Sequence, residues 1–391
     1  MVWGSLLTDA QRREVRAVSM TLLGELRQVS PDTRSHTLSE GAAGLALVCE
    51  VADQNNLGSF ETEGDAFLSR AVEDVAEYPI LPGLWQGYSG VCWVLDRFNN
   101  DGGESSGAIV DRYHKDITAQ CERRAYDLYG GLAGDGLALL ERTPSPDLER
   151  LLLRIVTALQ ALSTESEAGR HWVTSPDHLS IAGRKHSPTG FIATGMAHGS
   201  AGIISFLSQT IKLYPSITAA KELLQASTAW LLSQRNPKNK TRYPHTITKT
   251  ERREGRSAWC HGDIGVAVAL LMASQVLGNS SWEAEAVDTA RSAFRNNGID
   301  RRLPDLCLCH GASGVAQLYA FMAEVTRDKE CALAAASWHE HVLREYAKSA
   351  QGLHFYTASI NDEGEEVPQW TQDRSLLFGS ERWTPLSGPI S

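Results

Sequence analysis

The chain has 391 residues, of which 42% are hydrophobic and 21% are charged, a balance typical of soluble globular proteins. Its formal net charge is −10 and it has no run of five or more basic residues, which argues against nucleic-acid binding because neutralising phosphates requires clustered cations. We find no signal peptide and no apolar run of about 18 residues that could span a membrane. The seven cysteines of so long a chain indicate buried, catalytic or metal-bound thiols in a reducing, cytoplasmic compartment.

Amphipathic helices are predicted along the whole chain. The first carries Val15, Val18, Leu22 and Leu26 at spacings of three and four, and Asp9 is expected to cap it. Similar segments follow, and their polar faces suit the outer layer of a helical protein. They cover 65–78, a stretch opening at Asp147, 216–234, 281–296 and 329–348.

A Gly-x-x-Gly pattern that runs into an apolar helix recurs six times. Its glycine pairs are Gly41/Gly44, Gly87/Gly90, Gly131/Gly134, Gly199/Gly202, Gly262/Gly265 and Gly311/Gly314. A helix that is apolar nearly all round must be buried on all sides, so these helices would form an inner layer. Alternating outer and inner helices predict an all-α ring of helical hairpins, built as one domain over residues 1–391.

Two long segments, 163–195 and 236–257, interrupt the regular spacing of the repeats. Both contain Gly, Pro, Ser and Thr, and we expect long loops with short strands, of the kind that usually carry function. A seventh repeat is suspected at 373–379, but its second glycine is missing and Pro385 discourages a helix. We therefore expect an irregular or truncated final element.

The last three repeats carry chemically active residues at matching positions. Directly before the first glycine stand His198, His261 and His310, and one place earlier stand Cys260 and Cys309. Similar positions in a closed ring converge at one end of its axis, so these side chains are expected to meet.

Cys260, Cys309 and His310 predict a zinc site. Two thiols and an imidazole suit tetrahedral zinc, and three protein ligands leave a fourth position open for chemistry. The alternative is a pair of buried thiols beside a histidine that caps a helix. Cys307 competes as a ligand, but we expect its side chain to point elsewhere.

Other residues near these motifs have one functional and one structural interpretation. His198 could be a general acid or base, since an imidazole titrates near neutrality, or a structural histidine. Asp127 could orient an imidazole or cap a helix. Arg256 could stabilise an anionic intermediate or lie on the surface. His261 and Trp259 could line a substrate site, cap a helix or pack.

With these motifs the chain resembles the lanthionine synthetase C-like proteins, the cyclases of lanthipeptide biosynthesis. The resemblance spans nearly the whole chain and rests on the six glycine pairs and on three motifs, Ala197-His198-Gly199, Trp259-Cys260-His261-Gly262 and Cys309-His310-Gly311. It implies an α/α toroid of about seven helical hairpins. It also implies zinc at Cys260, Cys309 and His310, an acid/base role for His198, a supporting role for Asp127 and an active-site role for Arg256.

Two features depart from the family. Many cyclases have tyrosine where His261 stands, and the last glycine pair is absent after Gly379.

The implied reaction is thioether formation within a modified peptide. A peptide cysteine at the open zinc position would add as thiolate to the β-carbon of dehydroalanine or dehydrobutyrine, with Arg256 stabilising the enolate and His198 protonating it. A dehydrated precursor peptide is the expected substrate. We also expect this cytoplasmic protein to form a complex with a dehydratase and a transporter, which could place it at the membrane. Two alternatives are a family member that uses glutathione or another small thiol, and a non-catalytic peptide-binding scaffold with structural zinc.

Overall fold

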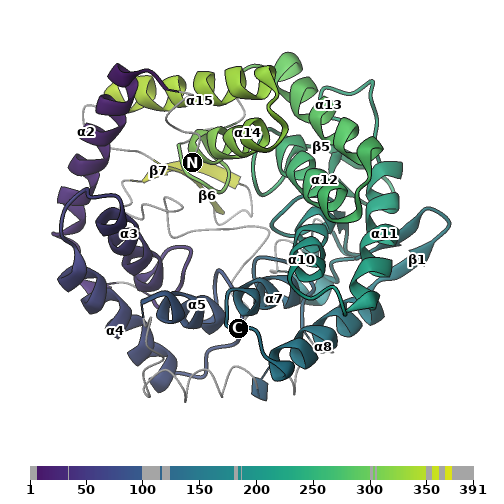
Figure 1. The fold of residues 1–391 in the computed structure, drawn as a ribbon, viewed down its shortest axis with the longest axis horizontal. Helices are drawn as coiled ribbons and strands as arrows, with labels where there is room; N and C mark the ends of the chain where they lie inside the picture. The colour runs from purple at the N-terminus through teal and green to yellow at the C-terminus, as the bar shows by residue number, and fades with distance from the viewer. Residues whose placement is uncertain are drawn as a thin grey trace.

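The computed structural model describes residues 7–33, 35–98, 115–116, 124–179, 184–185, 187–299, 303, 306–348, 355–360 and 366–371. Over these residues, helices form two concentric layers of a ring (Figure 1). The inner helices are α3 (Ala42–Gln54), α5 (Tyr88–Phe98), α7 (Leu132–Leu140), α10 (Ser200–Leu213), α12 (Asp263–Leu277) and α14 (Ala312–Thr326). The outer helices are α2 (Asp9–Leu26), α4 (Glu61–Glu77), α8 (Pro146–Leu162), α11 (Thr218–Ser233), α13 (Ser280–Asn297) and α15 (Lys329–Lys348). The predicted α/α toroid is confirmed.

Burial explains the two layers. In α12 the first nine residues are all buried, as expected for a helix surrounded by protein. In α8 only one stripe is buried, which includes Leu148, Leu152, Ile155 and Leu159. Five inner helices, α3, α7, α10, α12 and α14, each pack against the outer helix that follows in the chain, most extensively in α12–α13 and α14–α15. The last outer helix, α15, contacts the first, α2, and this contact closes the outer layer.

Several helix starts differ from the prediction by one to four residues, and the largest shift is in α4, which begins at Glu61 and not at 65. Thr8, and not Asp9, caps α2, because the Thr8 hydroxyl accepts from the Gln11 N–H while the Gln11 side chain accepts from the Thr8 N–H. Ser145 caps α8, which begins at Pro146, one residue before Asp147. Both aspartates lie in the first turn, where a negative charge interacts favourably with the helix dipole.

Backbone hydrogen bonds connect the six glycine turns that precede the inner helices. In each bond, the residue two places before the first glycine of one repeat donates its N–H to the carbonyl at the same position of the next repeat. The series is Ser39 to Trp85 (3.0 Å), Trp85 to Tyr129 (3.0 Å), Tyr129 to Ala197 (3.1 Å), Ala197 to Cys260 (3.3 Å) and Cys260 to Cys309 (3.2 Å). Residues at one repeat position therefore line up around the axis of the ring, at the N-terminal ends of the inner helices.

Close backbone packing explains the paired glycines. A Cβ atom on Gly262 would lie 1.6 Å from the carbonyl oxygen of Arg256, and one on Gly265 would lie 2.6 Å from that of Trp259. In both cases the carbonyl belongs to the residue six places earlier, so the turn folds directly onto the start of its own helix. Only glycine leaves room for that approach.

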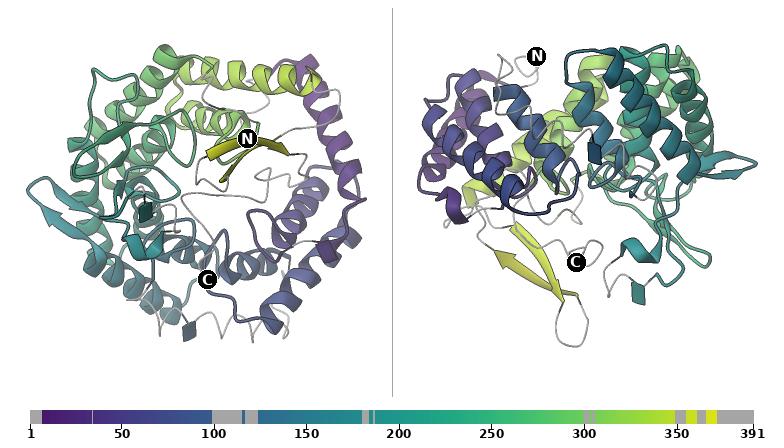
Figure 2. Two further views of the ribbon diagram at one scale, coloured as in Figure 1. Left: turned by 180° about the vertical axis from the view of Figure 1, so that it is seen from behind. Right: turned by 90° about the horizontal axis from the view of Figure 1, so that it is seen from below.

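The two long loops contain the expected short strands. The first forms a hairpin of β1 (Thr164–Ser166) and β2 (Gly169–His171), then the 3-10 turn η3 (Pro176–His178) and β3 (Ile192–Ala193). The second forms β4 (Pro244–Ile247) and β5 (Arg252–Glu254). The antiparallel order β3-β4-β5 joins both loops in one sheet, and the three views of the ribbon place these loops at one end of the ring (Figures 1 and 2).

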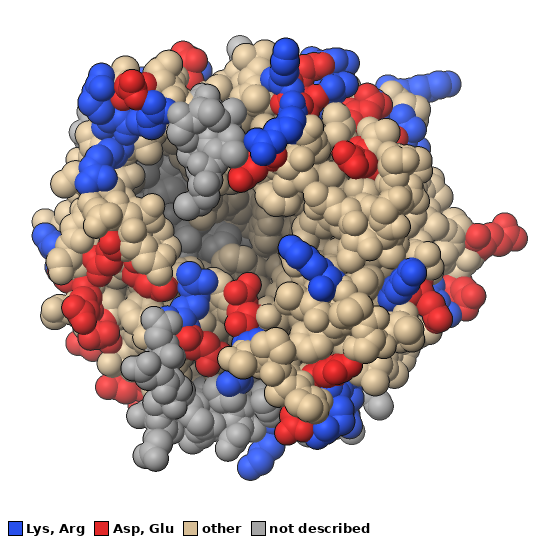
Figure 3. Space-filling view, in the orientation of Figure 1, with Lys and Arg blue, Asp and Glu red and all other residues tan. Residues whose placement is uncertain are grey.

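After α15 the chain forms an antiparallel hairpin of β6 (Phe355–Ile360) and β7 (Glu366–Thr371). The suspected seventh repeat at 373–379 lies outside the described residues. Basic and acidic side chains are both scattered over the hollowed face of the molecule in Figure 3. Over the described residues, no helix is long and apolar enough to cross a membrane.

Candidate active site

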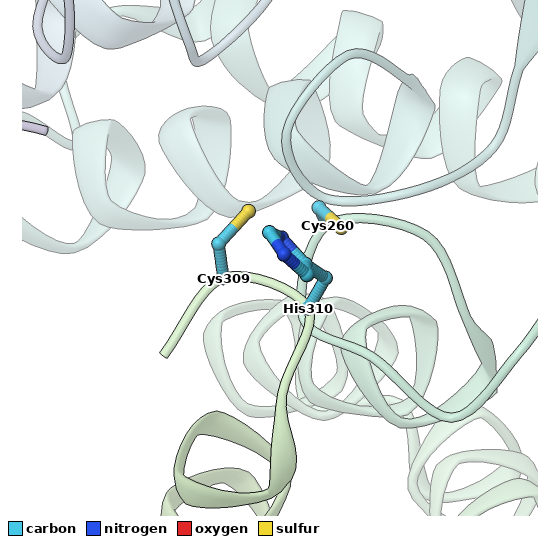
Figure 4. A group of neighbouring side chains, drawn as sticks. All are labelled: Cys260, Cys309 and His310. Atoms are coloured by element: carbon cyan, nitrogen blue, oxygen red, sulfur yellow. The ribbon is translucent and has the colours of Figure 1, made fainter. Parts of the chain in front are cut away.

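Three potential metal ligands meet where the turns before α12 and α14 lie side by side. The donor atoms of Cys260, Cys309 and His310 all lie within 4.8 Å of one another, and all three residues are buried. Figure 4 shows Cys309 and His310 on one turn and Cys260 on its neighbour. The backbone hydrogen bond from Cys260 to Cys309 fixes the two turns against each other.

The donor set fits a zinc ion. Zinc–sulfur and zinc–nitrogen bonds of about 2.3 and 2.0–2.1 Å place tetrahedral ligand atoms within the separation seen here. Burial raises the pKa of Cys260, but its hydrogen bond with Cys309 and the charge of Arg256 outweigh burial, so the pKa of the Cys260 thiol is lowered. Burial and the same hydrogen bond raise the pKa of Cys309. A bound metal cation would favour the thiolate form of both sulfurs.

Cys307 is not part of this donor group, in line with the expectation that its side chain points elsewhere. Its sulfur accepts the backbone N–H of His310 at 3.4 Å, so it supports the turn that carries the ligand.

His198 and Asp127 form a hydrogen-bonded pair at the same end of the ring. His198 Nδ1 lies 2.8 Å from Asp127 Oδ2, and the other carboxylate oxygen accepts the N–H of Gly130 at 2.9 Å. Burial lowers the pKa of His198, but the Asp127 carboxylate outweighs burial and the net pKa is raised. Burial would raise the pKa of Asp127, but His198 and the backbone N–H groups lower it overall. The cap of α7 is Gly131, so Asp127 closes the turn before that helix and orients the imidazole.

His261 connects this pair to the metal group. It follows Cys260 directly, it is buried, and its ring lies 5.8 Å from that of His198 in a stacked arrangement. Burial lowers the pKa of His261 strongly, and the nearby His245, His198 and Arg256 lower it further. His261 is therefore neutral near pH 7.

Arg256 and Trp259 lie on the turn before α12, and both are half-buried. The carbonyl of Arg256 packs on Gly262, and the positive charge of its guanidinium lowers the pKa of His245, after the larger effect of burial. Among the described residues, Arg256 forms no ion pair with a carboxylate. The Trp259 ring packs edge-on against Trp85, with centroids 5.7 Å apart, so its main contact is with another turn of the ring.

A pocket opens beside His198, and several of the residues that line it were not predicted from the sequence. Its lining includes Tyr126, Tyr129, Phe191 and His245. Repeat position could have revealed Tyr129, which stands two places before Gly131 just as Cys260 stands before Gly262. Nothing in the pattern of the sequence marks His245, which reaches the pocket from a long loop.

Comparison with known proteins assigns the sequence to a family. The model of the lanthionine synthetase C-like proteins matches residues 32–361, which is most of the chain. The chain belongs to this family. The resemblance found in the sequence is thereby confirmed.

Two relatives of this family member extend the match. The nisin biosynthesis protein NisC of Lactococcus lactis subsp. lactis is 22% identical over 323 residues, which cover 75% of each chain. The solved structure of a nisin cyclase has a TM-score of 0.69 and 21% identity, and the match covers 88% of this chain and 91% of that one. At this level of identity the structural match supports the fold alone.

Proposed function

We propose that the chain is a zinc-dependent lanthipeptide cyclase that closes (methyl)lanthionine rings. The proposal rests on one observation above all: the buried group of Cys260, Cys309 and His310 lies at the same end of the ring as the His198–Asp127 pair. A soft metal site beside an oriented imidazole suits the activation of a thiol followed by a proton transfer. The names of the nisin relatives point to the same chemistry.

Zinc is the metal that this donor set favours, because two thiolates and one imidazole match its preferred ligands. Cys260, Cys309 and His310 would hold the zinc, which would lower the pKa of a substrate thiol so that a thiolate is available near pH 7. The substrate peptide must then bring its own cysteine, which fits a site with three protein ligands.

The residues of the chain account for the remaining steps. The thiolate sulfur bonds to the β-carbon of dehydroalanine or dehydrobutyrine, and the Cα=Cβ electron pair moves toward the acyl oxygen. Arg256 supplies positive charge for the resulting enolate. His198 delivers a proton to the α-carbon from Nε2, because Nδ1 is held by Asp127. The thiol loses one proton and the α-carbon gains one, so the mass of the peptide is unchanged.

The protein partners of this chain can be inferred from its proposed substrate. A dehydrated precursor peptide requires a dehydratase, and we propose a complex of this chain with a dehydratase and a transporter at the cytoplasmic face of the membrane. The name of the NisC relative, a nisin biosynthesis protein, supports a biosynthetic setting of this kind.

The test uses a synthetic peptide that carries one dehydroalanine and one cysteine. Incubation with the zinc-loaded protein should remove the reactivity of the peptide thiol without changing the peptide mass, at a rate well above that with the Cys309→Ala variant. If both proteins give the same slow background rate, the proposal is wrong. Adding glutathione separates the small-thiol alternative, because transfer of glutathione to dehydroalanine increases the peptide mass while the cysteine stays reactive.

A further inference from the structure

His245 lies in the pocket although it comes from a loop far from the repeat motifs. It belongs to β4, and its ring centroid lies 4.1 Å from that of His261 at an interplanar angle of 53°. His261 in turn stacks near His198, so the three imidazoles form a row along one wall of the pocket.

The fold holds His245 in place from both sides. The buried Asp263, at the start of α12, accepts the backbone N–H groups of Arg242 at 2.7 Å and Tyr243 at 3.0 Å. On the other side, β4 pairs with β3, and the Thr194 hydroxyl donates to the carbonyl of Pro244. The position of His245 is therefore set by the inner helix and the sheet, as expected for a residue that must be preorganised.

Three ring nitrogens of this imidazole pair have no hydrogen-bond partner within the part of the chain that the structure describes. Among the described residues, no hydrogen-bond partner is present for His261 Nδ1, His261 Nε2 or His245 Nε2, and all three atoms are buried. Buried polar atoms are normally satisfied, so unpaired nitrogens in a pocket indicate a site for a polar ligand or water. Burial, followed by the charge of Arg256, lowers the pKa of His245 to about 4, so its neutral ring carries one N–H donor near pH 7.

The addition reaction needs donors of this kind. When the thiolate attacks the β-carbon, the displaced electron pair reaches the acyl oxygen of the dehydrated residue, and that oxygen becomes anionic until the α-carbon is protonated. Fixed N–H donors in a site shielded from water stabilise such an oxygen strongly. The half-buried Arg256 adds a positive charge on the same side.

We propose that His245 and His261 form the binding site for the acyl oxygen of the dehydroalanine or dehydrobutyrine acceptor. This inference rests on the proposed cyclase function and adds His245 as a residue that touches the substrate.

Three variants test the proposal. His245→Phe keeps a flat ring against His261 but removes the N–H, whereas His245→Gln keeps an N–H donor and loses the ring. The control is His171→Gln, because His171 is also an imidazole packed on an aromatic ring, 4.8 Å from Trp230, but lies outside the pocket. With the dehydroalanine–cysteine peptide, His245→Phe should cyclise roughly 100-fold more slowly. His245→Gln should retain more of the rate, and His171→Gln should equal the parent; all should keep their zinc.

A binding measurement separates this inference from the cyclase proposal. The probe is N-acetyl-dehydroalanine amide, which has no thiol, added to protein labelled with ¹⁵N in its histidine rings. The resonance that is missing in His245→Phe identifies His245, and the probe should shift it. If the parent cyclises peptides but the probe leaves this resonance unmoved, or His245→Phe cyclises within twofold of the parent, the acyl-oxygen site is wrong. If the probe shifts His245 but the parent does not cyclise, the site stands and the cyclase proposal fails.

Discussion

The backbone N–H of Cys260 donates to the carbonyl of Cys309 at 3.2 Å, although the two residues belong to different repeats. They occupy the same repeat position, and the ring places equal positions of neighbouring repeats side by side. Two thiols are thus brought together as potential ligands of one metal ion because the helical hairpins repeat, without a local metal-binding motif.

Removing one of these thiols should remove the metal. We expect Cys309→Ala to lose bound zinc, since two remaining ligands hold the ion poorly, and to lose cyclisation with it. The matched control is Cys307→Ala, because Cys307 is a buried thiol two residues away that lies outside the donor group. Atomic emission spectrometry of the purified proteins measures the zinc, and circular dichroism checks the fold. Zinc retained by Cys309→Ala, or lost only from Cys307→Ala, would contradict the assignment.

Asp127 should set the pH range of the reaction. It raises the pKa of His198 above the ordinary 6.5, so the proton-donating form persists to higher pH than it would alone. Replacing Asp127 by Asn keeps an oxygen for the Gly130 N–H but removes the charge. We therefore expect the alkaline limb of the rate–pH profile to move to lower pH, and the maximal rate to fall roughly 10- to 100-fold. An unchanged alkaline limb would exclude His198 as the proton donor.

The same pair should make stability depend on pH. The raised pKa of His198 stabilises the fold fully below 6.5, and that contribution is lost as pH rises through the folded-state pKa. The lowered pKa of Asp127 stabilises the fold above 3.8, and that contribution is lost as pH falls through its folded-state pKa. Urea denaturation should show the largest loss of stability in Asp127→Asn between pH 3.8 and 6.5. A difference that does not vary with pH would show that the pair is uncoupled.

The buried ion pair of Arg124 with Asp135 should stabilise the turn that carries Asp127. Arg124 lies 2.8 Å from the carboxylate of Asp135 and donates to the carbonyl of Gly130 at 2.8 Å, within the turn that Asp127 closes. Ser89 donates to the other oxygen of Asp135 at 2.7 Å. Arg124→Met leaves a buried carboxylate without its cation and should lower the free energy of unfolding by roughly 3–5 kcal/mol.

The double variant Arg124→Met/Asp135→Leu is the control for this ion pair. It removes both charges, so in urea denaturation it should be less destabilised than Arg124→Met alone. If the two variants are equally unstable, the charge of Asp135 is not the cause of the loss.

Backbone packing at the glycine turns predicts a sharp difference between two substitutions. Alanine at Gly262 would place a Cβ 1.6 Å from the carbonyl oxygen of Arg256, so the turn that carries Cys260 must move, and we expect lost zinc and a lower melting temperature. Alanine at the exposed Gly24, in α2, meets nothing within 4 Å and should stabilise the protein by about 0.5–1 kcal/mol. Calorimetry measures the thermal stability of both variants. A Gly262→Ala protein as stable as the parent would show that the turn can relax.

Much of this protein follows from its sequence alone. The spacing of apolar residues predicts the helices, because a face that must be buried recurs with the helical period, and α15 begins and ends where the pattern places it. The glycine pairs reveal the repeats, and the repeats predict that Cys260, Cys309 and His310 meet. Repetition carries long-range information, since equal positions in a ring are neighbours whatever their separation along the chain.

Only the tertiary structure reveals contacts that break the repeat. The packing of His245 on His261, the ion pair of Arg124 with Asp135, and the edge of Trp259 on Trp85 each join residues that no shared position relates. Side chains from loops and turns reach these partners through the folded path of the backbone, and that path depends on the packing of the whole ring. Local propensity and periodicity contain no record of it.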